Sequence, residues 1–161
     1  MTISRAAVRD LYHSTHECLD VVLEHVAGVP VDLLAKELSG FGHPSVIEQL
    51  SHLLAAEAAW VHRLQSLRFS QQDLGSLTTI EDVRRAKKQI MAATIAYLDS
   101  TSDLQFQTEL ERGGGGGGGP QRSPAFILLH VITHAFHHKG QIVAMLRLLD
   151  YPAPDTDMQR E

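Results

Sequence analysis

The sequence His130-Val131-Ile132-Thr133-His134-Ala135-Phe136-His137-His138-Lys139-Gly140-Gln141 holds four of the chain's ten histidines within nine residues. It lies inside a long, mainly apolar run from Phe126 to Leu149, which indicates a buried helix. On a helix, His130, His134 and His138 recur every four residues and therefore share one face. Apolar residues continue this stripe on both sides of the histidines, at Ile127, Met145 and Leu148. We therefore predict that the histidine row faces the interior of a helical protein.

Three further helices are predicted from apolar residues at helical spacing. With the histidine-rich helix they span residues 5–27, 46–67, 80–98 and 124–149. Ser45 followed by Glu48 is a capping-box pattern, Thr79 is a candidate N-cap, and Ser123-Pro124 supplies an N-cap and a first helical residue. Four long amphipathic helices without a convincing strand pair predict an all-α four-helix bundle. We assign residues 1–152 to this single domain and residues 153–161 to a C-terminal tail.

The segments between these helices have the composition of connections. Residues 28–44 contain several glycines and prolines, and residues 70–79 are polar. Weak alternation of Phe106, Thr108 and Leu110 predicts a short extended piece. The seven consecutive glycines Gly113–Gly119 have maximal backbone freedom and no side chains to pack, so we predict a flexible loop before the last helix.

Composition excludes several classes of function. The net charge of −5, without a basic cluster, argues against a nucleic-acid partner. The single cysteine, Cys18, excludes an internal disulfide and a cysteine-based zinc cage. The sequence has neither an apolar signal segment nor a run long enough to span a membrane. We therefore expect a cytoplasmic protein without a membrane partner.

The histidine row has the spacing of a metal site. Neighbouring members lie roughly 6 Å apart along the helix axis and the outer two roughly 12 Å apart, so one ion can take either neighbouring pair but not all three. A third ligand must come from another helix, and His52, beside small alanines on the second helix, is the best candidate. Three imidazoles with one open position are the coordination of a catalytic metal. The alternative is that these are hydrogen-bonded histidines of the core or surface.

Two polar residues are candidates for catalytic roles near this site. Glu57 lies on the apolar side of the second helix, where a carboxylate needs a partner. It would accept a hydrogen bond from a ligand histidine or act as a base, or else it forms a structural pair with an arginine or histidine. Gln141, three residues after His138, would bond a water on the metal or satisfy itself locally. His16, on the first helix, borders the core stripe and is a weaker candidate for the same cavity.

The opposite side of the last helix is also apolar. It carries Leu129, Phe136, Gly140 and Val143. A helix that is apolar on both sides is usually buried on both. We predict a homodimer through this face, with Gly140 allowing close approach; the alternative is that the first helix and the connector cover it.

These motifs together resemble those of the DinB/YfiT-like superfamily of metal-binding four-helix bundles. The run from His134 to Gln141 is similar to the histidine-rich last-helix motif of that family, with Lys139 where arginine is common. Leu50-Ser51-His52, followed by Glu57 and Trp60, is similar to its second-helix motif. The segment from Gly40 to Ser45 is also family-like. The resemblance covers nearly the whole chain except the glycine run.

The resemblance implies more than the residues alone. It implies that His52, His134 and His138 are the metal ligands, with His130 as a neighbour, and that the ion is divalent, such as zinc or nickel. It also implies a homodimer. Some members are thiol transferases that use a low-molecular-weight thiol, so a metal-dependent transferase of this type, acting on an unidentified small molecule, is the function we expect. A metal-dependent hydrolase and a non-enzymatic metal-binding dimeric bundle are the alternatives.

Overall fold

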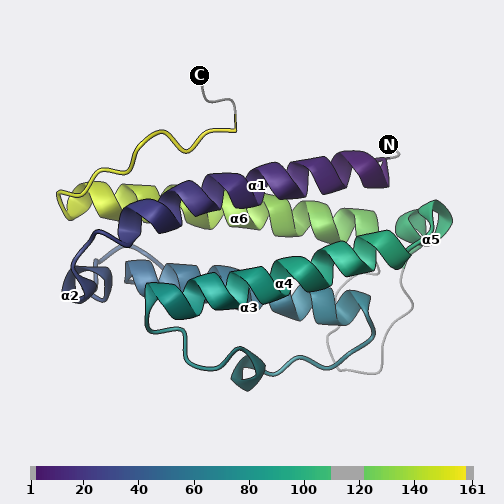
Figure 1. The fold of residues 1–161 in the computed structure, drawn as a ribbon, viewed down its shortest axis with the longest axis horizontal. Helices are drawn as coiled ribbons and strands as arrows, with labels where there is room; N and C mark the ends of the chain where they lie inside the picture. Colours follow the sequence, from purple (N-terminus) through teal and green to yellow (C-terminus); the bar gives the residue numbers. More distant parts are fainter. Residues whose placement is uncertain (1–2, 110–121, 159–161) are drawn as a thin grey trace.

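The computed structural model describes residues 3–109 and 122–158. Within these residues the chain forms six α-helices and one 3-10 helix. In chain order they are α1 (Arg5–Val26), α2 (Val31–Leu34), α3 (Val46–Leu64), the 3-10 helix η1 (Gln71–Leu74), α4 (Ile80–Ser100), α5 (Asp103–Gln107) and α6 (Pro124–Leu148). The four long helices lie side by side, and α1 and α3 each pack against both α4 and α6 (Figure 1). The prediction of an all-α four-helix bundle is confirmed.

Capping residues set the starts of the long helices. The Ser45 hydroxyl accepts a hydrogen bond from the Glu48 backbone N–H, and the Glu48 side chain accepts from the Ser45 N–H, so the predicted capping box is present. Thr79 and Ser123 cap α4 and α6 in the predicted positions. We predicted that the second helix extends to residue 67, but Ser66 has a φ of 58°, which is outside the helical region, and α3 ends at Leu64.

The expectation of an extended piece around Phe106 was wrong in its described part. Residues Asp103–Gln107 form the short helix α5. Its start is fixed by a capping box, in which Ser102 and Gln105 exchange side-chain and backbone hydrogen bonds. Phe106 is fully buried while Thr108 is exposed, so these two residues do not share one buried side, as alternate residues of a strand would. Leu110 and the predicted flexible loop Gly113–Gly119 lie outside the described residues.

The interior of the bundle consists of two apolar clusters with polar side chains between them. One cluster takes residues from Leu19 to Val26 of α1, and the other contains Val8 and Tyr12 of the same helix. His16 on α1, Glu57 on α3 and Thr94 on α4 occupy the boundary positions on their helices, and all three are buried. Polar groups in such a place need partners within the protein, because water is excluded there.

The C-terminal tail lies against the bundle over its described part. Ala153 packs against the larger apolar cluster, and the buried Lys139 ammonium of α6 donates a hydrogen bond to the backbone carbonyl of Thr156. The tail therefore has a defined place beside α6. Among the described helices, none combines the length and the apolar character that crossing a membrane requires.

Candidate metal centre

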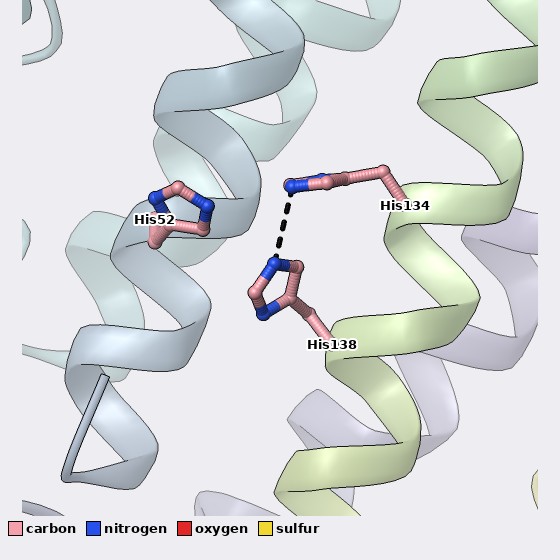
Figure 2. A group of neighbouring side chains, drawn as sticks. All are labelled: His52, His134 and His138. Atoms are coloured by element: carbon pink, nitrogen blue, oxygen red, sulfur yellow. Dashed lines mark hydrogen bonds between the residues drawn. The ribbon is translucent and has the colours of Figure 1, made fainter. Parts of the chain in front are cut away.

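Three histidine side chains from two helices meet between α3 and α6. His52 extends from α3 toward His134 and His138 of α6 (Figure 2). Each ring offers one nitrogen, and these three nitrogens lie within 4.8 Å of one another. The Nε2 atoms of His134 and His138 are 3.1 Å apart. The structure therefore brings together the three residues that the family resemblance implied as metal ligands.

The histidine row lies at the edge of the core rather than at its centre. Of the stripe that we predicted to point inward, Met145 is buried but Leu148 is 64% exposed. His130 is exposed, whereas His134 is half-buried and His138 is 6% exposed. The row therefore runs from solvent toward the interior, and the candidate site lies at its inner end.

The surroundings keep these rings neutral. Burial, followed by the charges of neighbouring histidines, lowers the pKa of His138 to about 3. The same causes lower the pKa of His134 to about 4, and burial together with His43 lowers the pKa of His52. A histidine whose pKa is lowered stays neutral at any pH above that value. Each ring therefore keeps a lone pair available to a cation at neutral pH.

The spacing of the nitrogens fits a divalent ion. Two imidazole nitrogens bound tetrahedrally at about 2.0–2.1 Å from zinc are about 3.3 Å apart, close to the 3.1 Å between the Nε2 atoms of His134 and His138. Imidazole is a ligand that zinc, nickel and copper accept. Within residues 3–109 and 122–158, no further His, Cys, Asp or Glu joins this group at the same spacing. The donor set therefore suits an ion with an open coordination position.

Two glutamines connect the inner histidine to the surrounding helices. The Oε1 atom of Gln49 lies 2.6 Å from His138 Nδ1. The Nε2 group of Gln49 donates hydrogen bonds to the His43 carbonyl oxygen (2.8 Å) and to Gln141 Oε1 (2.6 Å). Gln141 in turn donates from its Nε2 to His137 Nε2 (2.8 Å). Gln141 is therefore joined to His138 through Gln49, which bonds both of them.

A fourth histidine ring covers His52. His43, in the segment before α3, stacks on the His52 ring with centroids 3.8 Å apart and planes 22° apart. The group of donor atoms that lie within 4.8 Å of one another does not include His43. His43 therefore restrains the orientation of His52 without joining the group of three.

Glu57 lies in the polar region between the apolar clusters. Its Oε1 accepts a hydrogen bond from the Tyr12 hydroxyl (2.5 Å), and its Oε2 lies 3.4 Å from His16 Nε2. Burial and the negative charge of Glu57 raise the pKa of Tyr12, so the phenol keeps its proton and acts as donor. Among the described residues, Glu57 makes no hydrogen bond to the three clustered histidines. Its contacts correspond to the alternative of a structural partner, and His16 belongs to the same buried group.

The other two histidines of α6, His130 and His137, have other neighbours. The exposed His130 ring lies 5.4 Å from the Trp60 ring and 5.7 Å from the His134 ring, measured between centroids. His137 is exposed and contacts Gln141. Neither belongs to the group of three.

Sequence reasoning missed Gln49 and His43. Gln49 precedes His52 by three residues, so both lie on one side of α3, and it interrupts an otherwise apolar stripe. A polar residue within an apolar stripe was therefore an available signal. His43 gave no comparable signal, because its stacking depends on how the segment before α3 folds back.

Comparison with known proteins gives a family and a fold. The sequence model of the DinB family matches residues 4–161. A crystal structure of a DinB-like protein from Bacillus cereus ATCC 10987 superposes with a TM-score of 0.73 at 16% sequence identity, and the match covers 96% of this chain and 99% of that one. At that identity the likeness concerns the fold alone. No curated protein matches the chain.

Proposed function

Since this chain belongs to the DinB family, we propose that it binds one divalent metal ion through His52, His134 and His138 and acts as a metal-dependent enzyme of the thiol-transferase type. The observation that carries the proposal is the group of three ring nitrogens within 4.8 Å, without a fourth protein ligand among the described residues. A closed four-ligand site is typical of structural metal, whereas three protein ligands leave a position for a substrate or water.

The chain's own residues prepare this site in two ways. The lowered pKa values of His134 and His138 keep both rings free of protons at neutral pH, so metal binding does not have to displace them. Contacts from Gln49 and His43 hold two of the rings in place. A divalent ion held there supplies Lewis acidity, which lowers the pKa of a thiol or water that coordinates it. Zinc and nickel are the ions that the family resemblance implies, and both accept imidazole ligands.

Cobalt substitution followed by thiol titration tests the proposed activity type. The cobalt-loaded protein is titrated with cysteine as a simple thiol, and the near-ultraviolet absorption is followed for a sulfur-to-cobalt band. We expect a saturable band in the wild type and none in His134→Ala. One bound cobalt per chain without any thiol-dependent band contradicts the thiol-transferase type and leaves a hydrolase or a non-enzymatic role.

We also propose that the chain forms a homodimer through the face of α6 that carries Leu129, Phe136, Gly140 and Val143. In the single chain, Leu129, Phe136 and Val143 are half-buried, and Gly140 is exposed. A side-chain carbon added at Gly140 would meet no neighbouring atom within 4 Å, so a second chain has room to approach there. The Lys139 ammonium lies 4.5 Å from the centroid of the Phe136 ring and donates to the Thr156 carbonyl of the tail. It therefore marks the edge of this face.

A further inference from the structure

The most completely bonded buried amide at the site belongs to Gln49. Its side chain is fully buried, and all of its hydrogen-bonding groups have partners. Its three partners come from two places: the segment before α3 provides the His43 carbonyl, and α6 provides His138 and Gln141. Ordering a glutamine side chain in this way has an entropic cost, so a fully bonded buried amide indicates a specific geometric role.

The orientation of the Gln49 amide fixes the proton position on His138. The His43 partner is a backbone carbonyl oxygen, which only accepts hydrogen bonds, so the Gln49 NH₂ group must face it. The amide oxygen of Gln49 therefore faces His138 Nδ1, 2.6 Å away. An oxygen acceptor at that distance requires a proton on Nδ1. In a neutral ring the lone pair is then on Nε2, the nitrogen that faces His134.

The same amide also reaches a second ring of the site. By donating to the His43 carbonyl, Gln49 holds the segment whose imidazole stacks on His52 at 3.8 Å. One buried side chain thus contacts His138 directly and acts on His52 through His43. Partners in this outer layer of a metal site orient the ligand rings and select their tautomer.

We propose that Gln49 is the positioning residue of the metal centre, which holds His138 as the Nδ1–H tautomer with its Nε2 lone pair directed at the ion and steadies His52 through the His43 segment. This inference rests on the proposed metal binding only for its consequence for affinity. The tautomer of His138 is a property of the metal-free protein and is tested separately.

Two measurements on Gln49→Leu test the proposal. In the metal-free protein, long-range ¹H–¹⁵N correlation spectra report which nitrogen of His138 carries the proton. We expect Nδ1–H in the wild type and loss of that preference in Gln49→Leu. Zinc affinity, measured by chelator competition, should fall about 10–100-fold in the variant. Thr94→Val, which alters another buried polar residue, on α4, whose hydroxyl donates to the Ile90 carbonyl, should change neither readout.

The variant Gln49→Glu keeps the oxygen acceptor of this side chain and removes its N–H donors. It also serves as the test if Gln49→Leu does not fold. A carboxylate still accepts from His138 Nδ1, so this variant should keep the Nδ1–H tautomer. Retention of Nδ1–H in Gln49→Leu, its loss in Gln49→Glu, or a zinc affinity of Gln49→Leu within twofold of wild type overturns the proposal. A wild type that binds no zinc but shows the expected tautomers refutes the proposed metal function and leaves the role of Gln49 in orienting His138 supported.

Discussion

Replacing Tyr12 with phenylalanine should weaken the fold and leave the metal centre intact. The Tyr12 hydroxyl donates to Glu57 Oε1 over 2.5 Å, and both side chains are almost completely buried. The other carboxylate oxygen, Oε2, has no hydrogen-bond partner among the described residues, although His16 Nε2 lies 3.4 Å away. The hydroxyl is therefore the principal donor to this carboxylate, and its removal leaves a buried charged group poorly satisfied.

The size of the effect follows from the type of bond that is lost. A hydrogen bond to a charged group contributes about 1.5–3 kcal/mol, and leaving a buried acceptor unsatisfied adds a cost of desolvation. Phenylalanine keeps the ring, so no large cavity forms. We expect Tyr12→Phe to lower the free energy of unfolding by about 2–3 kcal/mol. For a chain of this size that corresponds to a fall in Tm of roughly 4–12 °C.

Thermal and chemical unfolding of the metal-free protein measure this change. The matched control is Tyr151→Phe, a half-buried tyrosine outside the Glu57 group, which should change stability by less than about 0.5 kcal/mol. Zinc affinity of Tyr12→Phe should equal that of wild type, because Glu57 is bonded to Tyr12 rather than to the clustered histidines. An unchanged Tm refutes the reasoning about the buried carboxylate. A large loss of zinc affinity in a folded variant refutes the separation of Glu57 from the metal centre.

Three further predictions concern the metal centre and the dimer. Because the pKa values of His134 and His138 are lowered to about 4 and 3, protons compete with metal at these two rings only in acid, and zinc affinity should weaken less than about tenfold between pH 7.5 and 5.5. Three ordinary histidines would each lose about tenfold over this range, so a loss approaching about a thousandfold contradicts this prediction. His43→Ala removes the ring stacked on His52 and should weaken zinc binding while one zinc per chain remains; equal affinity by chelator competition counts against the stacking role. Phe136→Glu places a charge in the proposed dimer face and should produce monomers by light scattering, so an unchanged dimer argues for a different interface.

Local patterns in the sequence were sufficient to predict the bundle and a row of histidines on its last helix, but not which of these histidines cluster. Helix starts at Ser45, Thr79 and Ser123 depend on contacts within three residues, which the sequence displays directly. Helical spacing allowed either neighbouring pair of the row, and the family resemblance selected His134 and His138. The placement of His52 beside them needed the packing of α3 on α6, and the family resemblance supplied that expectation.

Features that depend on distant contacts were not predicted. Gln49 and Gln141 are 92 residues apart in the chain, and their hydrogen bond exists only because α3 and α6 pack together. The bond between Tyr12 and Glu57 likewise crosses 45 residues, so the sequence alone left two interpretations of Glu57 open. Helix α5 was missed for a different reason: its capping box of Ser102 and Gln105 is a local pattern, but we predicted an extended piece from the alternation that includes Phe106.

Metal stoichiometry measured with two histidine variants tests the central claim most directly. Purified wild type, His134→Ala and His137→Ala are reconstituted with zinc, passed through a desalting column and assayed by elemental analysis. His134 is one of the three clustered rings, whereas His137 is an exposed neighbour on the same helix. We predict about one zinc per chain in the wild type and in His137→Ala, and a loss of stoichiometric zinc in His134→Ala. Full zinc content in His134→Ala, or no zinc in the wild type, would contradict the assignment of the three histidines as metal ligands.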